Sequence, residues 1–391
     1  MMNNELYKGK SFRLTYLLPV IVIGLCVPIN SVLAQSDEPT SKPSAEPAST
    51  AVSAPTSTPS DLDKIKSWLG MSLTLQAGYL YNFENPKDQK NPLRLFDDRA
   101  NSFTVDLAEI QFAHDPQKGE VGYKVKFIAG ETAKWIHASG LGMGDNPIDL
   151  TEAYVTYIAP LGSGLTLRLG KFVTCHGAEV IEAKDNINYS RSFLFNYAIP
   201  ITHTGLMASY TFAEIFTTTV YVVNGWDDAV DNNRAKTYGL SLTLTPNPQW
   251  TAVANFMAGP EQPGNDSDWR FLLDLILTAK PTNELTFVLN GDYGRDTVAG
   301  KDVSWHGVSL ISKYDFLSWL GAAMRLEYFN DRNGYRTNVA QELKEITITT
   351  EFRLPMNLIL RPEYRHDWSD KVAFQGNKSQ DTLGVGMIYV W

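Results

Sequence analysis

The last eleven residues, Asp381-Thr-Leu-Gly-Val-Gly-Met-Ile-Tyr-Val-Trp391, decide the fold. Large apolar side chains occupy every second position of this stretch: Leu383, Val385, Met387, Tyr389 and Trp391. The intervening positions hold mostly smaller residues: Thr382, Gly384, Gly386, Ile388 and Val390. A period of two residues predicts a β-strand whose two faces lie in different surroundings.

The final tryptophan indicates what those surroundings are. A chain end in water usually frays, so a soluble protein rarely finishes on an exposed tryptophan. A lipid–water interface, in contrast, favours an amphipathic ring. A terminal strand of alternating apolar residues that closes on Trp391 resembles the assembly signal of bacterial outer-membrane β-barrels. From this stretch alone, the alternative is the last strand of a soluble sheet.

The N-terminus has the features of an export signal. Three basic residues between positions 8 and 13 precede an apolar run over 14–27. That run has the length of a signal-peptide core and is short for a membrane helix. Val32-Leu-Ala34 offers small residues at a cleavage site, so we expect residues 1–34 to be a signal peptide. Cys26 leaves a lipoprotein as the alternative, although Leu25 before it is the wrong size for a lipidation site.

The next two segments precede the main domain. Residues 35–60 are rich in Pro, Ser, Thr and Ala and cannot bury enough apolar surface to fold, so they predict a disordered linker. Residues 61–70 predict a short helix, with Asp61 as a candidate N-cap. We expect this helix to be a lead-in to the main domain or a plug within it.

From residue 71 to residue 391 the sequence repeats a strand pattern. Most candidate strands have about the nine to eleven residues with which a tilted strand crosses a bilayer. The sixteen candidates are 71–83, 102–114, 121–130, 150–158, 164–172, 204–211, 215–224, 236–245, 249–258, 269–279, 284–292, 303–314, 320–329, 341–353, 357–366 and 381–391. The second candidate loses its alternation at Ala108-Glu109, which predicts a β-bulge there. The fold class is therefore all-β, a transmembrane antiparallel up-and-down β-barrel of about 16 strands.

The connections alternate between short and long. Tight turns rich in Pro, Gly and Asn occur at 160–164, 246–248, 281–283 and 355–357. Longer polar stretches lie between the turns: 84–101, 131–149, 173–203, 225–235, 259–268, 293–302, 330–340 and 367–380. Bacterial barrels have short periplasmic turns and long extracellular loops, and an even strand number leaves both chain ends in the periplasm. A large soluble β protein is the alternative, but a sandwich has no reason to sort its loops in this way.

The third long connection, 173–203, differs from the others because half of it is apolar. Phe193, Phe195, Tyr197 and Ile199 would be unfavourable in a loop exposed to water on both sides. We therefore expect this connection to fold into the lumen and narrow it. Its charged residues would then face the passage: Glu179, Glu182, Lys184, Asp185 and Arg191. The alternative is a lid on the outer rim of the barrel.

Charged residues within the strands are expected to line the pore. An Arg or Lys facing lipid at the bilayer midplane would cost about 2–4 kcal/mol. Facing water, such side chains can order permeating solutes, or they serve only to keep the lumen hydrated and the wall stiff. The basic candidates are Lys124, Lys126, Arg168, Arg270, Arg325, Arg353, Arg361 and Arg365. The acidic candidates are Glu152, Asp274, Asp292, Glu327, Glu351 and Glu363, so the two signs are too evenly balanced to predict ion selectivity.

Short motifs around the third long connection resemble a known family. They are Leu167-Arg-Leu-Gly-Lys-Phe172, Gly177-Ala-Glu-Val180, Ser190-Arg-Ser192, Pro200, His203-Thr-Gly205 and Val223-Asn-Gly-Trp-Asp227. Their order is similar to that of the putative β-barrel porin-2 family of bacterial outer membranes. The resemblance implies an outer-membrane porin that passes small hydrophilic solutes and ions by passive diffusion. It also implies membrane lipid and the barrel assembly machinery as partners, the latter through the strand ending in Trp391, and assembly as a homotrimer.

Two other functions stay open. One is a channel specific for an oligosaccharide or an anion. The other is a barrel-embedded hydrolase, which would need a nucleophile and a base within reach of each other. The histidines at 176, 203, 306 and 366 are not accompanied by a Gly-x-Ser-x-Gly elbow, so we expect no catalytic residues. No paired-Cys or His-x-x-x-His spacing suggests a metal, and we expect no cofactor.

Cysteine count and charge exclude further classes. After removal of residues 1–34, Cys175 is the only cysteine, so the exported chain has no intrachain disulfide. The formal net charge is -9, which argues against a nucleic-acid partner.

Overall fold

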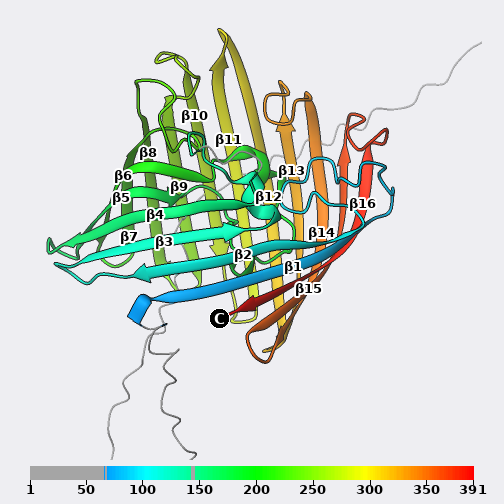
Figure 1. Cartoon of the computed structure of the whole chain (residues 1–391), viewed down its shortest axis with the longest axis horizontal. Coiled ribbons are helices and arrows are strands. Elements are labelled where there is room, and N and C mark those ends of the chain that lie inside the picture. The colour runs from blue at the N-terminus through cyan, green and yellow to red at the C-terminus, as the bar shows by residue number, and fades with distance from the viewer. Residues whose placement is uncertain (1–65, 67, 142–145) are drawn as a thin grey trace, which may run out of the picture.

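A computed structural model describes residues 66, 68–141 and 146–391. The described residues form sixteen antiparallel strands, each paired with its neighbours in the sequence, and β1 closes the barrel by pairing with β16 (Figure 1). The strands are β1 (Met71–Asn82), β2 (Ser102–His114), β3 (Val121–Ala129), β4 (Ile148–Ala159), β5 (Leu165–Val173), β6 (Thr202–Phe212), β7 (Phe216–Val223), β8 (Thr237–Asn247), β9 (Trp250–Pro260), β10 (Trp269–Ala279), β11 (Leu285–Val298), β12 (Lys301–Leu317), β13 (Leu320–Asp331), β14 (Gln341–Leu354), β15 (Leu358–Ser369) and β16 (Ser379–Val390). The predicted fold class and strand number are confirmed.

Helical structure is scarce among the described residues. It consists of α2 (Glu131–Trp135), the 3-10 turn η1 (Ala183–Asp185) and the π-helical turn η2 (Leu194–Ala198), together with Lys66, Trp68 and Leu69 before the barrel. No described helix is long and apolar enough to cross a membrane. The predicted signal peptide, the predicted linker and the first half of the predicted helix at 61–70 lie outside the described residues.

Two details of the predicted strands are wrong. Residues 293–302 are not a long loop, because β11 and β12 continue to Val298 and from Lys301. Ala299 and Gly300 alone connect them, both with positive φ (51° and 73°), as a two-residue hairpin requires. This part of the hairpin is polar, which is why its sequence reads as a loop. The bulge in β2 lies at Asp106 rather than at Ala108-Glu109, since Gln76 pairs with Leu107 and Ala77 pairs with Val105.

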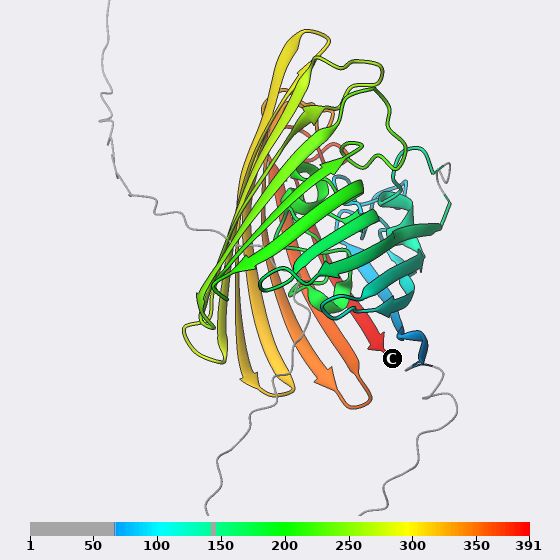
Figure 2. The same cartoon turned by 90° about the vertical axis from the view of Figure 1, so that its left-hand side faces the viewer.

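The two faces of the wall differ as the alternation predicts. Large apolar side chains are exposed on the outside, for example Leu75, Val105 and Leu206. The inner face of β1 carries buried polar residues such as Thr74 and Gln76. The wall is also uneven in length, from 8 residues in β7 to 17 residues in β12, as Figures 1 and 2 show.

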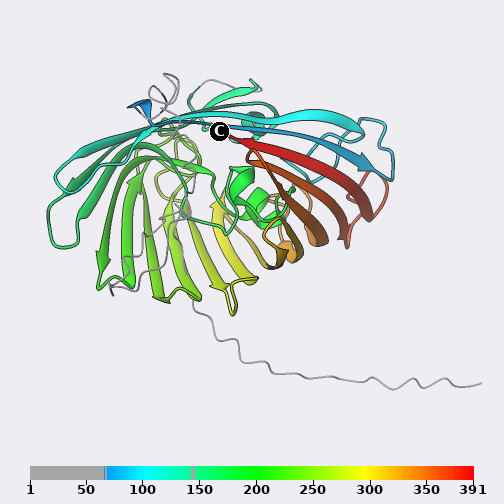
Figure 3. The ribbon, with the colours of Figure 1, turned by 90° about the horizontal axis from the view of Figure 1, so that it is seen from below.

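The connection between β5 and β6 lies inside the barrel. Seen from below, its helical turn stands within the ring of strands (Figure 3). We call residues 174–201 the internal loop. Its Tyr189 ring packs against β1 and β16 at two glycines, Gly78 and Gly386. A Cβ atom on Gly386 would lie 2.3 Å from a ring carbon of Tyr189, so a larger residue would have to displace the ring.

Candidate pore and its internal loop

The apolar half of the internal loop builds a hydrophobic core within the barrel. Phe193, Leu194, Phe195 and Ile199 are each at most 3% exposed. They share one cluster with side chains from the strands and from other long loops, including Phe96, Trp226, Trp305 and Phe329. Burial of these apolar side chains explains why the loop folds inward rather than into solvent. The indole nitrogen of Trp305 also donates a hydrogen bond to the carbonyl of Ala198 (3.0 Å).

Carboxylates of the barrel wall accept hydrogen bonds from the loop backbone. Glu327 of β13 accepts from the N–H groups of Phe193 and Leu194, both at 2.7 Å. Glu363 of β15 accepts from Tyr189 (2.7 Å) and Ser190 (3.0 Å). Buried backbone donors need partners, and the two oxygens of a carboxylate can each accept one of them. The two glutamates therefore bind the loop on both sides of Arg191 and Ser192.

A third wall carboxylate binds the start of the loop. Asp274 of β10 accepts a hydrogen bond from the N–H of Gly177 (2.9 Å). Its neighbour in the β10–β11 register is Asp292, a second buried carboxylate. Asn290 of β11 accepts a hydrogen bond from the N–H of Ala178 (3.0 Å). The neighbouring amides of Gly177 and Ala178 therefore bind the neighbouring strands β10 and β11.

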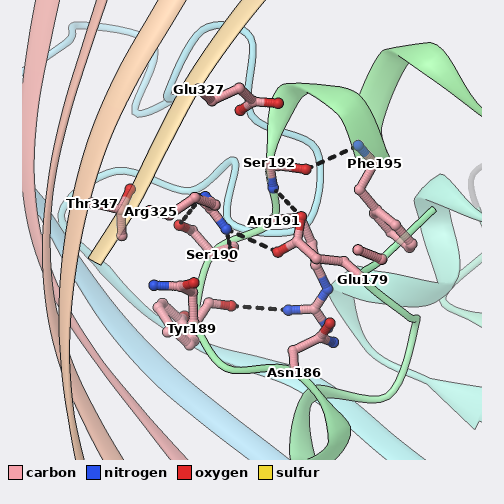
Figure 4. A network of polar contacts seen from close by, with 12 residues as sticks. Glu179, Asn186, Tyr189, Ser190, Arg191, Ser192, Phe195, Arg325, Glu327 and Thr347 are labelled. Atoms are coloured by element: carbon pink, nitrogen blue, oxygen red, sulfur yellow. Dashed lines mark hydrogen bonds and ion pairs between the residues drawn. The ribbon is translucent and has the colours of Figure 1, made fainter. Parts of the chain in front are cut away.

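Wall arginines satisfy the loop carbonyls in the same way. Arg325 of β13 is fully buried, donates to the carbonyl of Ser190 (2.8 Å) and forms an ion pair with Glu179 of the loop (2.8 Å). Glu179 in turn accepts from the N–H of Ser192 (2.8 Å), as Figure 4 shows. Arg325 also pairs with Glu345 of β14 (2.6 Å).

Two more arginines reach the loop from β15. Arg365 donates to the carbonyl of Arg191 (2.6 Å), and Arg361 donates to the carbonyl of Ala183 (2.6 Å). Arg361 also pairs with Glu351 of β14 at 2.7 Å. Each of these wall cations therefore joins the backbone of the loop to the network of wall charges.

The internal loop is also held together by its own side chains. Arg191 donates to the carbonyls of Val180 (3.0 Å), Ile181 (2.8 Å) and Tyr189 (3.0 Å), and burial lowers its pKa. Burial acts to raise the pKa of Glu182, but the ammonium group of Lys126 on β3 pairs with it and brings the pKa down to about 2. Among the five charged loop residues from the sequence, only Lys184 and Asp185, which pair with each other, keep much solvent exposure.

The other charged strand residues lie in wall networks. Lys124 and Lys126 pair with Glu152 (2.8 and 2.9 Å), and Arg270 pairs with Asp296 (2.8 Å). Arg353 pairs with Asp315 and with Glu351 (3.4 Å). Arg168 differs, because among the described residues no carboxylate lies within ion-pair distance of it. Its guanidinium lies over the ring of Tyr154 (4.3 Å to the centroid) and contacts the sulfur of Met207 (3.9 Å).

Several buried charges of the wall were missing from the residues selected by sequence. They include Glu109, Asp149, Lys171, Asp296, Glu345 and Asp367. Glu345 could have been found, because it shares the alternating register of Thr347 and Glu351 in β14. Asp106 could not, since the bulge changes the phase of the alternation at that residue.

One part of the wall carries no charges. The sequences of β6, β7, β8 and β9 contain no Asp, Glu, Lys or Arg. Hydroxyl groups pair across β6 and β7 instead, Ser209 with Thr219 (2.8 Å) and Thr211 with Thr217 (2.9 Å). The described residues form no group of three or more His, Cys, Asp or Glu side chains that could hold a metal ion.

Solved structures that share this architecture include a porin and other proteins of the outer membrane. An anion-selective porin from Comamonas acidovorans superposes with a TM-score of 0.58 at 10% identity, over 82% of this chain and 98% of its own. The outer-membrane channel DcaP of Acinetobacter baumannii gives 0.56 at 12% identity, over 82% and 96%. The trimer form of OmpT, an outer-membrane protein of Vibrio cholerae, gives 0.57 at 11% identity, over 82% and 98%. At these identities the likeness concerns the fold.

The closed barrel, together with the family model that matches most of this chain, defines an outer-membrane channel of the porin class. The model of the family described as putative beta-barrel porin-2, OmpL-like, matches residues 69–390, and the chain belongs to this family. The family places the protein in the bacterial outer membrane. A search of curated proteins finds no match to the sequence.

Proposed function

We propose that the protein lets small hydrophilic solutes and ions diffuse passively through a water-filled lumen, past the internal loop. The observation that carries this proposal is the contrast between the faces of the wall. The outside exposes apolar side chains to lipid, whereas the inside carries hydroxyl, amide and charged groups. A closed barrel satisfies the strand backbone within lipid, so the lumen is free to be polar. No enzymatic step and no cofactor belong to this function.

The proposal includes the path to the membrane and the assembled form. Residues 1–34 act as a cleaved signal peptide, and the short turns lie in the periplasm. The strand that ends near Trp391 is the part recognised by the barrel assembly machinery. The ammonium group of Lys66 lies over the ring of Trp391, 4.1 Å from its centroid. A homotrimer is the proposed assembly, supported by the trimer form of the similarly folded OmpT.

Reconstitution of the purified protein in a planar bilayer tests the function. We expect stepwise ion conductance, and a reversal potential in asymmetric salt that measures charge selectivity. Protein boiled before reconstitution serves as the control, since it lacks the folded barrel. Absence of conductance above that control would contradict a pore, and hydrolysis of an ester or peptide substrate by the same preparation would favour the embedded hydrolase.

A channel specific for an anion is the second candidate function. The observation that favours it is Arg168, an inner-wall cation without a carboxylate partner among the described residues. Block of the current by low concentrations of phosphate, but not of a neutral oligosaccharide, would support this candidate. Exclusion graded only by solute size would support the general pore.

A further inference from the structure

We infer that Glu327 and Glu363 are positioning residues that hold the internal loop across the lumen and so set the size of the passage. This inference rests on the proposed porin function. It differs from the usual expectation for pore charges, because it assigns these two carboxylates to the backbone of the loop rather than to the permeating solute.

The geometry of the two glutamates is the first argument. Each uses both carboxylate oxygens to accept from two consecutive N–H groups, Tyr189 and Ser190 for Glu363, and Phe193 and Leu194 for Glu327. Glu327 is 6% exposed and Glu363 is 4% exposed, so little of either carboxylate is left for a solute to contact. Four backbone donors of the loop therefore depend on these two side chains.

The charge balance is the second argument. Within the part of the chain that the structure describes, neither Glu327 nor Glu363 lies within 4.0 Å of a Lys or Arg nitrogen. Glu351, on the same inner wall, instead pairs with Lys313 (2.8 Å), Arg353 (3.4 Å) and Arg361 (2.7 Å), and it makes no hydrogen bond to the loop. The wall thus contains two kinds of glutamate, one bound to loop amides and one bound to wall cations.

The internal loop contacts several strands of the wall, so it extends across the lumen. Besides its hydrogen bonds to Glu327 and Glu363, the loop contacts β1 and β16 through Tyr189. It contacts β3 through the ion pair of Glu182. It contacts β12 through Leu194, which lies against Gly307. The loop therefore bridges opposite parts of the wall, and release of its clamped segments widens the space beside it.

Glutamine is the sharpest substitution for each glutamate. It keeps the size of the side chain but places an NH2 group where one oxygen accepted a backbone N–H, so one hydrogen bond is lost and two donors face each other. Loss of a buried hydrogen bond, with a donor left without a partner, shifts the balance between held and released loop by about tenfold to hundredfold. Glu351→Gln is the matched control, because Glu351 makes no hydrogen bond to the loop. Its partner Arg361 donates to the carbonyl of Ala183, which lies outside the four measured amides.

Hydrogen exchange of the full-length protein in detergent gives a readout that does not depend on conduction. We expect the amides of Tyr189 and Ser190 to exchange about tenfold to hundredfold faster in Glu363→Gln. The amides of Phe193 and Leu194 should do so in Glu327→Gln, and none of the four should change in Glu351→Gln. Unchanged exchange in both loop-facing variants would overturn the inference.

Single-channel recording then tests the effect on the passage. Glu327→Gln and Glu363→Gln should give larger or more strongly fluctuating conductance steps, whereas Glu351→Gln should change ion selectivity without changing the fluctuations. Faster exchange with parental conductance would refute the role of the clamp in pore size. If the parent protein itself does not conduct, the proposed function fails, while the exchange result still decides whether the two glutamates hold the loop.

Discussion

The barrel has a charged wall and an uncharged wall, and they differ in what they do for the internal loop. The charged wall, β10–β16, supplies Asp274, Glu327 and Glu363 to the loop amides and Arg325, Arg361 and Arg365 to the loop carbonyls. The uncharged wall, β6–β9, contains no Asp, Glu, Lys or Arg. The uncharged wall binds the start of the loop through neutral groups instead, since the side-chain amide of Asn255 in β9 donates to the carbonyl of Cys175 (2.7 Å).

This difference teaches that inward-facing charges have two separate roles. A loop that enters a barrel carries backbone N–H and C=O groups that would be costly to bury without partners. Charged side chains of the wall meet that requirement. The charges that remain accessible to solutes are fewer than the alternation of the strands suggests, and Lys184, Asp185 and Arg168 are among them.

The largest effect should follow removal of the central cation of the charged wall. Arg325→Met leaves Glu345 and Glu179 without their shared partner, and we expect a loss of about 3–5 kcal/mol in the free energy of unfolding. Urea unfolding in detergent micelles, followed by tryptophan fluorescence, measures this. Thr219→Val in the uncharged wall is the comparison and should cost about 1 kcal/mol. Equal losses in the two variants would contradict the distinction between the walls.

The second effect concerns pH at the rim of the uncharged wall. Glu261 follows β9, accepts hydrogen bonds from the N–H of Trp226 and the hydroxyl of Thr237, and burial raises its pKa from 4.5 to about 7. The folded state then binds the proton more tightly than the unfolded state. Stability should therefore fall as the pH rises from about 4.5 to about 7, by roughly 3 kcal/mol at most.

Glu261→Gln isolates that contribution. The variant has no titrating group at this position, so its unfolding free energy should vary less between pH 4.5 and pH 7 than that of the parent. Unfolding curves at several pH values measure the difference. Parallel pH profiles for the parent and the variant would show that Glu261 is not the group responsible.

The third effect tests how closely Tyr189 of the internal loop packs against β16. A Cβ on Gly386 would lie 2.3 Å from the Tyr189 ring, so Gly386→Ala should cost about 1–3 kcal/mol or displace the loop and change the conductance. Gly291→Ala is the matched control, because the nearest atom to its Cβ would lie at 3.8 Å. Identical stability and conductance in the two variants would exclude tight packing of Tyr189.

Much of this fold could be predicted because each strand of a membrane barrel alternates between apolar and polar residues, a pattern that is visible in the sequence of that strand alone. The bounds of β2 and β10 agree with the sequence pattern to the residue. The prediction of a long loop at 293–302 was wrong because the ends of these two strands are polar. They therefore lack the alternation of apolar residues that predicts the other strands.

The candidate site was less predictable from sequence. Alternation tells which charges point inward, but it does not tell which of them meet the loop. Glu327 and Glu351 occupy equivalent inward positions in their strands, yet the first binds two loop amides and the second binds three wall cations. That division depends on the path of the internal loop, which is fixed by contacts between residues far apart in the chain.

The smallest effect should come from the cation beside the uncharged wall. Arg168 has no carboxylate partner among the described residues and lies over the ring of Tyr154, so its charge is available to anions in the lumen. Arg168→Gln should lower the anion-to-cation permeability ratio by up to about fivefold, because an accessible charge contributes about 1 kcal/mol or less. Reversal potentials in asymmetric salt measure the ratio, and Arg168→Lys, which keeps the charge, should retain it. If Arg168→Gln retains it as well, selectivity is set elsewhere, and the charged wall would be the place to search.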